Sequence, residues 1–156
     1  MEAFFADFLE RLHVLNQEFI ASFDGLPAEA LDWVPGEDMN SFCALVVHAT
    51  GSARFWVGDA ALGESSNRDR DAEFRARGLS EAELKARFAA LEAYVEGALS
   101  RLTLADLAAV RVINSGTPHQ REITVGWALL HALEHTGIHL GHAQITRQLW
   151  QQNLRF

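Results

Sequence analysis

Near the carboxyl-terminal end of the sequence, twelve residues hold four histidines: His131, His135, His139 and His142. Residues three and four apart stack on one face of an α-helix, so the four imidazoles would fall within about 80° of arc. Imidazole is the commonest protein ligand of transition metals, and a helical His-x3-His pair can place two nitrogens on one ion. The spacing therefore predicts a metal site, for which His48, in a second apolar helical stretch, is the best third ligand.

Each of these histidines also has a plainer interpretation. His135 and His139 could be neutral core histidines that hydrogen-bond to neighbours, but two adjacent imidazoles in an apolar helix are hard to satisfy otherwise, which favours the metal. His131, one turn before the pair, is a candidate fourth ligand, a candidate base in a substrate pocket, or a packing residue. His142 is a candidate ligand or proton carrier, or simply faces a neighbouring helix.

The composition of the chain excludes several classes of protein. Its 156 residues, 49% of them hydrophobic, fit a single domain over residues 1–156 with a sizeable core. The net charge of -8 argues against a nucleic-acid binder. The sequence has no apolar run long enough for a membrane span and no signal-peptide pattern. The lone Cys43 excludes a thiolate-rich zinc site and suits a reducing cytoplasm, so we expect a cytoplasmic protein whose metal ligands are nitrogen and oxygen.

Apolar residues recur at spacings of three and four over much of the chain, which predicts helices. Ser80 and Glu83 form a capping box at the start of the third helix. The fourth is apolar nearly all round, which is typical of a central, buried helix. We therefore predict an all-α four-helix bundle with helices near 2–23, 41–62, 80–101 and 124–151.

Two connections between these helices have distinct compositions. Residues 63–79 are polar, and arginines alternate with acidic residues there, so we interpret them as a long surface connection with a solvated face. Further along, residues 104–110 suit a short helical turn. Residues 111–113 and 121–123 suit extended arms around the turn sequence Asn114-Ser115-Gly116.

Together these motifs resemble the DinB/YfiT-like superfamily of metalloenzymes. The resemblance covers nearly the whole chain: Trp33-Val-Pro35 before the second helix, His48 within it, and Glu134-His135-Thr-Gly-Ile-His139-Leu-Gly141 in the last. It implies an up-down-down-up bundle with a long crossover between helices two and three. It also implies that His48, His135 and His139 hold a divalent metal, commonly zinc or nickel. Many members have glutamine directly after this motif, where the present chain has His142.

Three neutral imidazoles leave at least one coordination position of a metal open, which is typical of catalytic sites. Water or a thiol bound there becomes acidic. The resemblance implies a thiol S-transferase or a thiol-dependent isomerase that acts on a small-molecule substrate with a low-molecular-weight thiol, and His131 or His142 would carry protons. Metal-activated hydrolysis is a variant on the same site.

The alternative function is a non-catalytic, stress-linked protein that binds a metal or a small molecule. For the enzyme, we expect a pocket lined by His131 or His142 and by aromatic or aliphatic side chains of helices one and two, with Trp56 at its edge. The apolar face around Phe4, Phe5 and Phe8 would also suit a homodimer contact.

Overall fold

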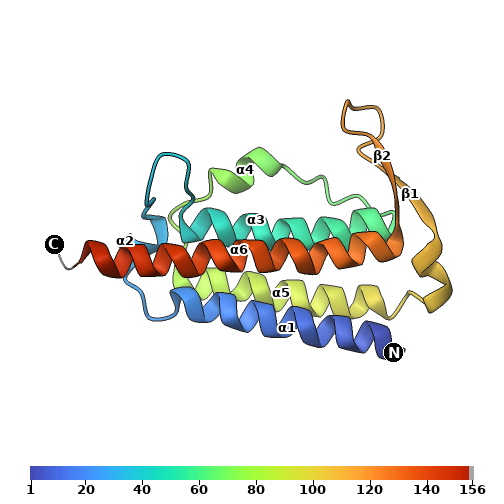
Figure 1. The fold of residues 1–156 in the computed structure, drawn as a ribbon, viewed down its shortest axis with the longest axis horizontal. Helices are drawn as coiled ribbons and strands as arrows, with labels where there is room; N and C mark the ends of the chain where they lie inside the picture. The colour runs from blue at the N-terminus through green and yellow to red at the C-terminus, as the bar shows by residue number, and fades with distance from the viewer. Residues whose placement is uncertain (155–156) are drawn as a thin grey trace.

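Four long helices form the body of the protein in a computed structural model that describes residues 1–154 (Figure 1). They are α1 (Ala3–Phe23), α3 (Phe42–Arg54), α5 (Glu81–Leu99) and α6 (Val125–Asn153). Helices α5 and α6 each pack against both α1 and α3. In Figure 1, α1 and α6 run in one direction and α3 and α5 run in the other. The predicted all-α bundle is confirmed. When α3 is counted together with the π-helix η1 (Phe55–Leu62) that continues it, the helix bounds differ from those expected by at most two residues.

The second predicted helix is continuous but changes its winding. Ser41 accepts a hydrogen bond from the backbone N–H of Ala44 and so caps the start of α3. After Arg54 the chain continues as the π-helix η1 (Phe55–Leu62), which ends at Gly63 in a left-handed conformation with φ +73°. The sequence predicted α-helix throughout, so this π-helix is a correction. Such turns are rare and occur frequently at functional sites.

The crossover from η1 to α5 is more ordered than the sequence indicated. A short helix, α4 (Arg70–Phe74), begins where the Asp69 side chain accepts a hydrogen bond from the backbone N–H of Ala72, and it packs against α3. Glu73 on this helix is 7% exposed. The prediction of a solvated surface connection is therefore wrong at this point, because part of the charged segment faces the bundle.

The remaining connections are short. Helix α2 (Ala28–Asp32) lies between α1 and α3, and the 3-10 helix η2 (Leu104–Ala108) follows α5. Strands β1 (Val110–Ile113) and β2 (Arg121–Thr124) pair antiparallel, with Val110 opposite Thr124, which confirms the predicted extended arms. Thr124 then accepts a hydrogen bond from the backbone N–H of Trp127 and caps α6.

The core consists of two apolar clusters stacked along the bundle axis. On α6, Ala132 belongs to the first cluster and Leu140 to the second, and on α3 the corresponding residues are Ala53 and Ala49. The paired histidines of α6 lie between these levels. Among the described helices, none combines the length and the apolar character needed to cross a bilayer.

Candidate metal site

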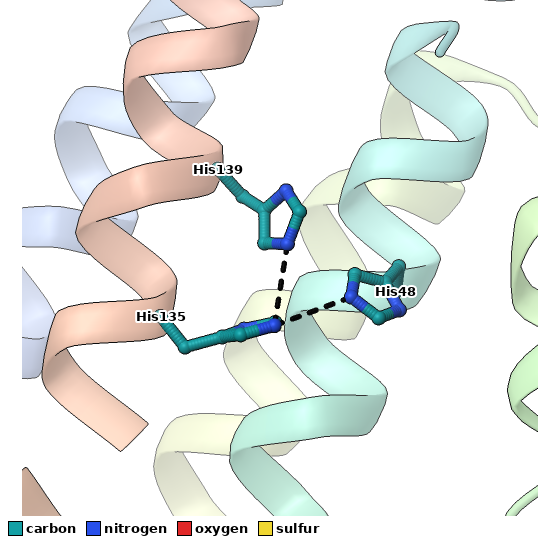
Figure 2. Close-up of side chains that lie close together, drawn as sticks. All are labelled: His48, His135 and His139. Carbon is teal, nitrogen blue, oxygen red and sulfur yellow. Dashed lines mark hydrogen bonds between the residues drawn. The ribbon is translucent and has the colours of Figure 1, made fainter. Parts of the chain in front are cut away.

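Three histidines from two helices point their rings at one another (Figure 2). Nε2 of His135 lies 3.3 Å from Nε2 of His48 on α3 and 3.3 Å from Nε2 of His139, one turn further along α6. One ring nitrogen from each residue lies within 4.8 Å of those of the other two. The structure thus brings together the three residues that the sequence singled out as ligands.

The spacing of these nitrogens fits a shared metal ion. Two ligand nitrogens that each lie about 2.0–2.1 Å from one zinc ion, at a tetrahedral angle, are about 3.3–3.4 Å apart. The Nδ1 atoms of His135 and His139 have no hydrogen-bond partner within the described residues, and the Nε2 atoms contact one another and Nε2 of His48, so the polar contacts of the rings converge on the place of the ion. The donor set suits zinc, nickel and other divalent ions that imidazole binds.

The electrostatic surroundings keep two of the ligands neutral. Burial, followed by the nearby positive charge that His48 would carry, lowers the pKa of His135 to about 4. Burial and then the charge of His135 lower the pKa of His139 to about 3. Neutral imidazole is the form that binds a metal, so both side chains are ready to coordinate at pH 7 without releasing a proton.

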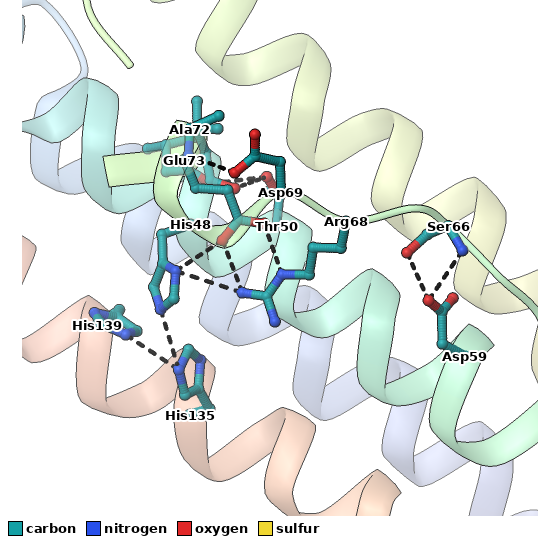
Figure 3. Close-up of polar contacts among 12 residues, drawn as sticks. His48, Thr50, Asp59, Ser66, Arg68, Asp69, Ala72, Glu73, His135 and His139 are labelled. Carbon is teal, nitrogen blue, oxygen red and sulfur yellow. Dashed lines mark hydrogen bonds and ion pairs between the residues drawn. The ribbon is translucent and has the colours of Figure 1, made fainter. Parts of the chain in front are cut away.

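The third ligand is oriented by the crossover (Figure 3). Nδ1 of buried His48 lies 2.9 Å from Oε2 of Glu73. The same carboxylate accepts two hydrogen bonds of 2.7 Å from Arg68, from Nε at Oε1 and from Nη2 at Oε2. Burial acts to raise the pKa of Glu73, but the hydrogen bonds from His48 and Arg68 outweigh it and the pKa is lowered. An ionised carboxylate can only accept, so Nδ1 of His48 carries the proton and Nε2 presents its lone pair to the other histidines.

A glycine on α3 makes room for this carboxylate. A Cβ atom on Gly51 would lie 2.2 Å from Oε1 of Glu73, which is far inside van der Waals contact. Gly51 lies one turn after His48, on the side that the crossover covers. On the other side of Glu73, the ring of Phe74 packs on that of His48 with 4.2 Å between centroids. The crossover and α3 therefore fit each other closely beside the ligand.

A cavity of about 310 Å³, here called the histidine pocket, opens beside the ligands. His48 and His135 line it together with Phe55 and Trp56 of η1 and His131 of α6. The predicted lining by His131 and by aromatic residues of the second helix is confirmed, including Trp56 at the edge. No residue of α1 lines the pocket, contrary to expectation, because α3 and α6 separate α1 from it.

His131 is held in place by three neighbours. Its ring stacks on Trp127 at 4.7 Å and meets Trp56 edge-on at 4.6 Å. Its Nδ1 lies 3.0 Å from Oε2 of Glu134, whose side chain is 66% exposed. The Glu134 side chain is therefore exposed and contacts His131, not a candidate metal ligand, and this contact leaves the other ring nitrogen of His131 available to the pocket.

Comparisons with known proteins agree with this fold and site. The family model of the DinB superfamily matches residues 11–143. The chain belongs to the DinB superfamily. A structure described as a conserved protein of a locus from Enterococcus faecalis is similar in fold, with 16% sequence identity, a TM-score of 0.75, and coverage of 96% of this chain and 97% of that one. No curated protein matches the sequence.

His142 occupies a different environment in this DinB-superfamily protein. Its ring lies 5.3 Å from that of His139, but its side chain lines a separate cavity of about 230 Å³ together with Asp38, Met39 and Leu45. It does not belong to the group of three converging nitrogens. Cys43 is buried and hydrogen-bonded to the carbonyl of Leu79, and burial raises the pKa of its thiol to about 12, so it is a packing residue.

Sequence reasoning missed Glu73 and Arg68, the residues that orient His48. They lie 25 and 20 positions after the histidine, and no local periodicity connects such distant residues. Two weak signals were available. Asp69 is a preferred helix N-cap residue within the crossover, and Gly51 is an isolated glycine inside an apolar helix, which usually has a packing reason.

Proposed function

We propose that this DinB-superfamily protein is a divalent-metal-dependent enzyme of the thiol S-transferase or thiol-dependent isomerase type, with His48, His135 and His139 as the metal ligands. The observation that carries the proposal is that two of these three ligands also line the histidine pocket. Within the described residues, no fourth histidine, cysteine or carboxylate joins the group. A bound ion would therefore keep a coordination position that a substrate can reach.

The nearest carboxylate has another role. Glu73 contacts Nδ1 of His48 and not the converging Nε2 atoms, so it supports a ligand and does not close the site. When bound, a divalent ion such as zinc or nickel lowers the pKa of a coordinated thiol or water and so supplies the nucleophile. The Trp56 and Phe55 rings would exclude water from one wall of the pocket and pack on the carbon skeleton of the substrate.

His131 is the residue that would move protons in the histidine pocket. Its Nδ1 is held by Glu134, so the opposite nitrogen can accept the proton of an incoming thiol and return it to the product. Stacking on Trp127 fixes the plane of the ring. His142 is less suitable for this role, since it lines another cavity.

The test begins with protein purified without a nickel column. Elemental analysis should find about one divalent ion per chain, and a screen of small thiols against electrophiles should find conjugation that a chelator abolishes and added metal restores. His131→Gln should lose about a hundredfold or more in activity while it retains its metal. Metal-loaded protein that binds no thiol in a calorimetric titration would contradict the proposal.

One observation favours the second candidate, a non-catalytic metal or small-molecule binding protein. The ligands come from α3 and α6, so an ion would link the two helices and stabilise the bundle. In that case metal binding should raise the melting temperature, but the ion should be four-coordinate and closed to thiols. The same titration separates the two functions.

A further inference from the structure

The wall of the histidine pocket has a charge opposite to that of the whole protein. The chain carries a net charge of -8, yet the pocket is lined by Arg68 and Arg70 and, among the described residues, by no carboxylate. A negatively charged protein repels anions in general, so a cationic cavity beside the candidate metal ligands would favour the binding of anions at this place.

The two arginines are not equivalent. Arg68 donates two hydrogen bonds to Glu73, and this ion pair neutralises its charge. Arg70 forms no ion pair within the described residues, and its side chain is exposed. The positive charge that remains available to a ligand in the pocket is therefore that of Arg70.

Aromatic packing holds Arg70 close to the ligands. Its guanidinium lies over the ring of Phe74, 4.9 Å from the centroid, and Phe74 in turn packs on His48. Arg70 and the candidate ligands His48 and His135 line the same cavity, so an anion on Arg70 would lie in the pocket that these histidines line.

Neutral hydrogen-bonding groups complete the polar side of the pocket. Ser52 on α3 and Asn114, at the ribbon turn, both belong to the lining. Phe55, Trp56 and His131 form the aromatic side. A cavity of about 310 Å³ with one free guanidinium, two neutral polar groups and an aromatic wall suits a small molecule with a single carboxylate.

We infer that the thiol substrate of the histidine pocket carries a carboxylate that pairs with Arg70 while its sulfur faces the three histidines. This inference rests on the proposed function and adds the chemical class of the thiol. A planar guanidinium matches a carboxylate with two parallel hydrogen bonds, and the single charge of Arg70 balances the single charge of a carboxylate.

The test compares two thiols of nearly equal size, mercaptoacetate and 2-mercaptoethanol, in calorimetric titrations of the zinc-loaded protein. Mercaptoacetate should bind about five- to tenfold more tightly, the range expected for one charge-assisted hydrogen-bonded pair at a partly exposed site. Arg70→Gln should remove this preference and leave the affinity for 2-mercaptoethanol unchanged. Arg75→Gln is the matched control, since Arg75 directly follows α4 but does not line the pocket, and it should keep the preference.

Several results would overturn the inference. Equal affinity for the two thiols, an unchanged preference in Arg70→Gln, or an equal loss in Arg75→Gln would each do so while leaving the proposed function intact. Stronger competition against mercaptoacetate by inorganic phosphate than by acetate would overturn the assignment of a carboxylate. Zinc-loaded protein that binds neither thiol would refute the proposed function, and the inference would fall with it.

Discussion

The two ends of the crossover use similar residues for different purposes. At one end, Glu64 accepts hydrogen bonds from Arg54, Arg101 and the hydroxyl of Tyr94. At the other end, Glu73 accepts hydrogen bonds from Arg68 and from Nδ1 of His48. Both carboxylates have lowered pKa values. The first network ties the crossover to α5, and the second ties it to a candidate metal ligand.

What differs is the last partner of each carboxylate. The Tyr94 phenol donates to Glu64 and its ring packs against Arg54, 3.6 Å from the ring centroid, and neither contact leads to a candidate metal ligand. His48 has a second ring nitrogen, Nε2, which faces the other two histidines, so the orientation that Glu73 imposes on the ring acts on the three-histidine group. A carboxylate–arginine pair of the same kind therefore supports a candidate metal site when an imidazole lies between the carboxylate and the other candidate ligands.

The largest effect should follow from removing that imidazole. His48→Ala should weaken zinc binding more than about a hundredfold, beyond the loss expected for a supporting residue, because two ligands remain where three converged. Tyr94→Phe, which removes the corresponding partner of Glu64, should leave zinc affinity unchanged. Competition with a chromophoric chelator measures both. Stoichiometric, tight zinc in His48→Ala would show that another site binds the metal.

A smaller loss should follow from neutralising the carboxylates. Glu73→Gln should weaken zinc binding about tenfold, because His48 loses the charge that fixes its tautomer and raises its basicity. Glu64→Gln, at the other end of the crossover, should change zinc affinity by less than about twofold. Equal losses in the two variants would mean that the crossover supports the site only through its overall stability.

Acidification should destabilise the metal-free protein in two pH ranges, first through the buried histidines and then, at lower pH, through the carboxylates. The pKa values of His135 and His139 lie near 4 and 3, below the ordinary 6.5, so between pH 6.5 and about 4 the unfolded chain binds more protons than the folded one. The metal-free protein should therefore lose stability as the pH falls through this range. The lowered pKa values of Glu64 and Glu73 shift their own losses below about pH 4.5.

Thermal melts of metal-free protein between pH 7 and pH 5 measure this effect. The melting temperature of the wild type should fall across the range, and that of a His135→Gln, His139→Gln double variant should fall less steeply. Parallel curves for the two proteins would contradict the neutral, buried state of these histidines.

The smallest effects on zinc affinity should follow from substituting two glycines, of which Gly51 lies beside Glu73 and Gly58 beside Arg54 and Tyr94. A Cβ on Gly51 would displace Glu73, and a Cβ on Gly58 would lie 1.9 Å from Nη1 of Arg54 and 2.3 Å from the hydroxyl of Tyr94. Gly51→Ala should lower zinc affinity a fewfold, whereas Gly58→Ala should not. At Gly51 the displaced group ends a flexible side chain and alanine favours helix, so the unfolding free energy of Gly51→Ala should change by only about 1 kcal/mol. Gly58→Ala must also displace the rigid ring of Tyr94 and should lower the unfolding free energy by more. A loss of zinc affinity in Gly58→Ala but not in Gly51→Ala would mean that the Glu64 network, and not the Glu73 network, supports the candidate metal site.

The sequence predicted those features that depend on the spacing of residues within one helix. Apolar spacing gave the four long helices, the capping box at Ser80 placed the start of α5, and the histidine stripe of α6 identified two ligands. His48 was found because it lies in an apolar helical stretch. These features depend on periodicity within one element, which a single sequence displays directly.

The supporting residues depend on contacts between elements, which the sequence does not display. Arg68 and Glu73 lie in a segment of alternating charge, whose pattern is also typical of a solvated surface. His131 lies four residues before the central pair and His142 three residues after it, and these similar spacings gave no indication that, of the two, His131 lines the histidine pocket. The π-helical winding of η1, which carries Phe55 and Trp56, has no distinct sequence pattern here.

The central claim is that the three histidines hold a divalent ion that is open to a thiol from the histidine pocket. Cobalt(II) tests it most directly, because its absorption spectrum reports both coordination number and sulfur ligation. The account predicts one cobalt ion per chain, and the appearance of thiolate-to-cobalt charge-transfer absorption when mercaptoacetate is added. It predicts neither signal in His48→Ala. A stoichiometric cobalt complex of the wild-type protein whose spectrum is unchanged at saturating thiol would contradict the claim.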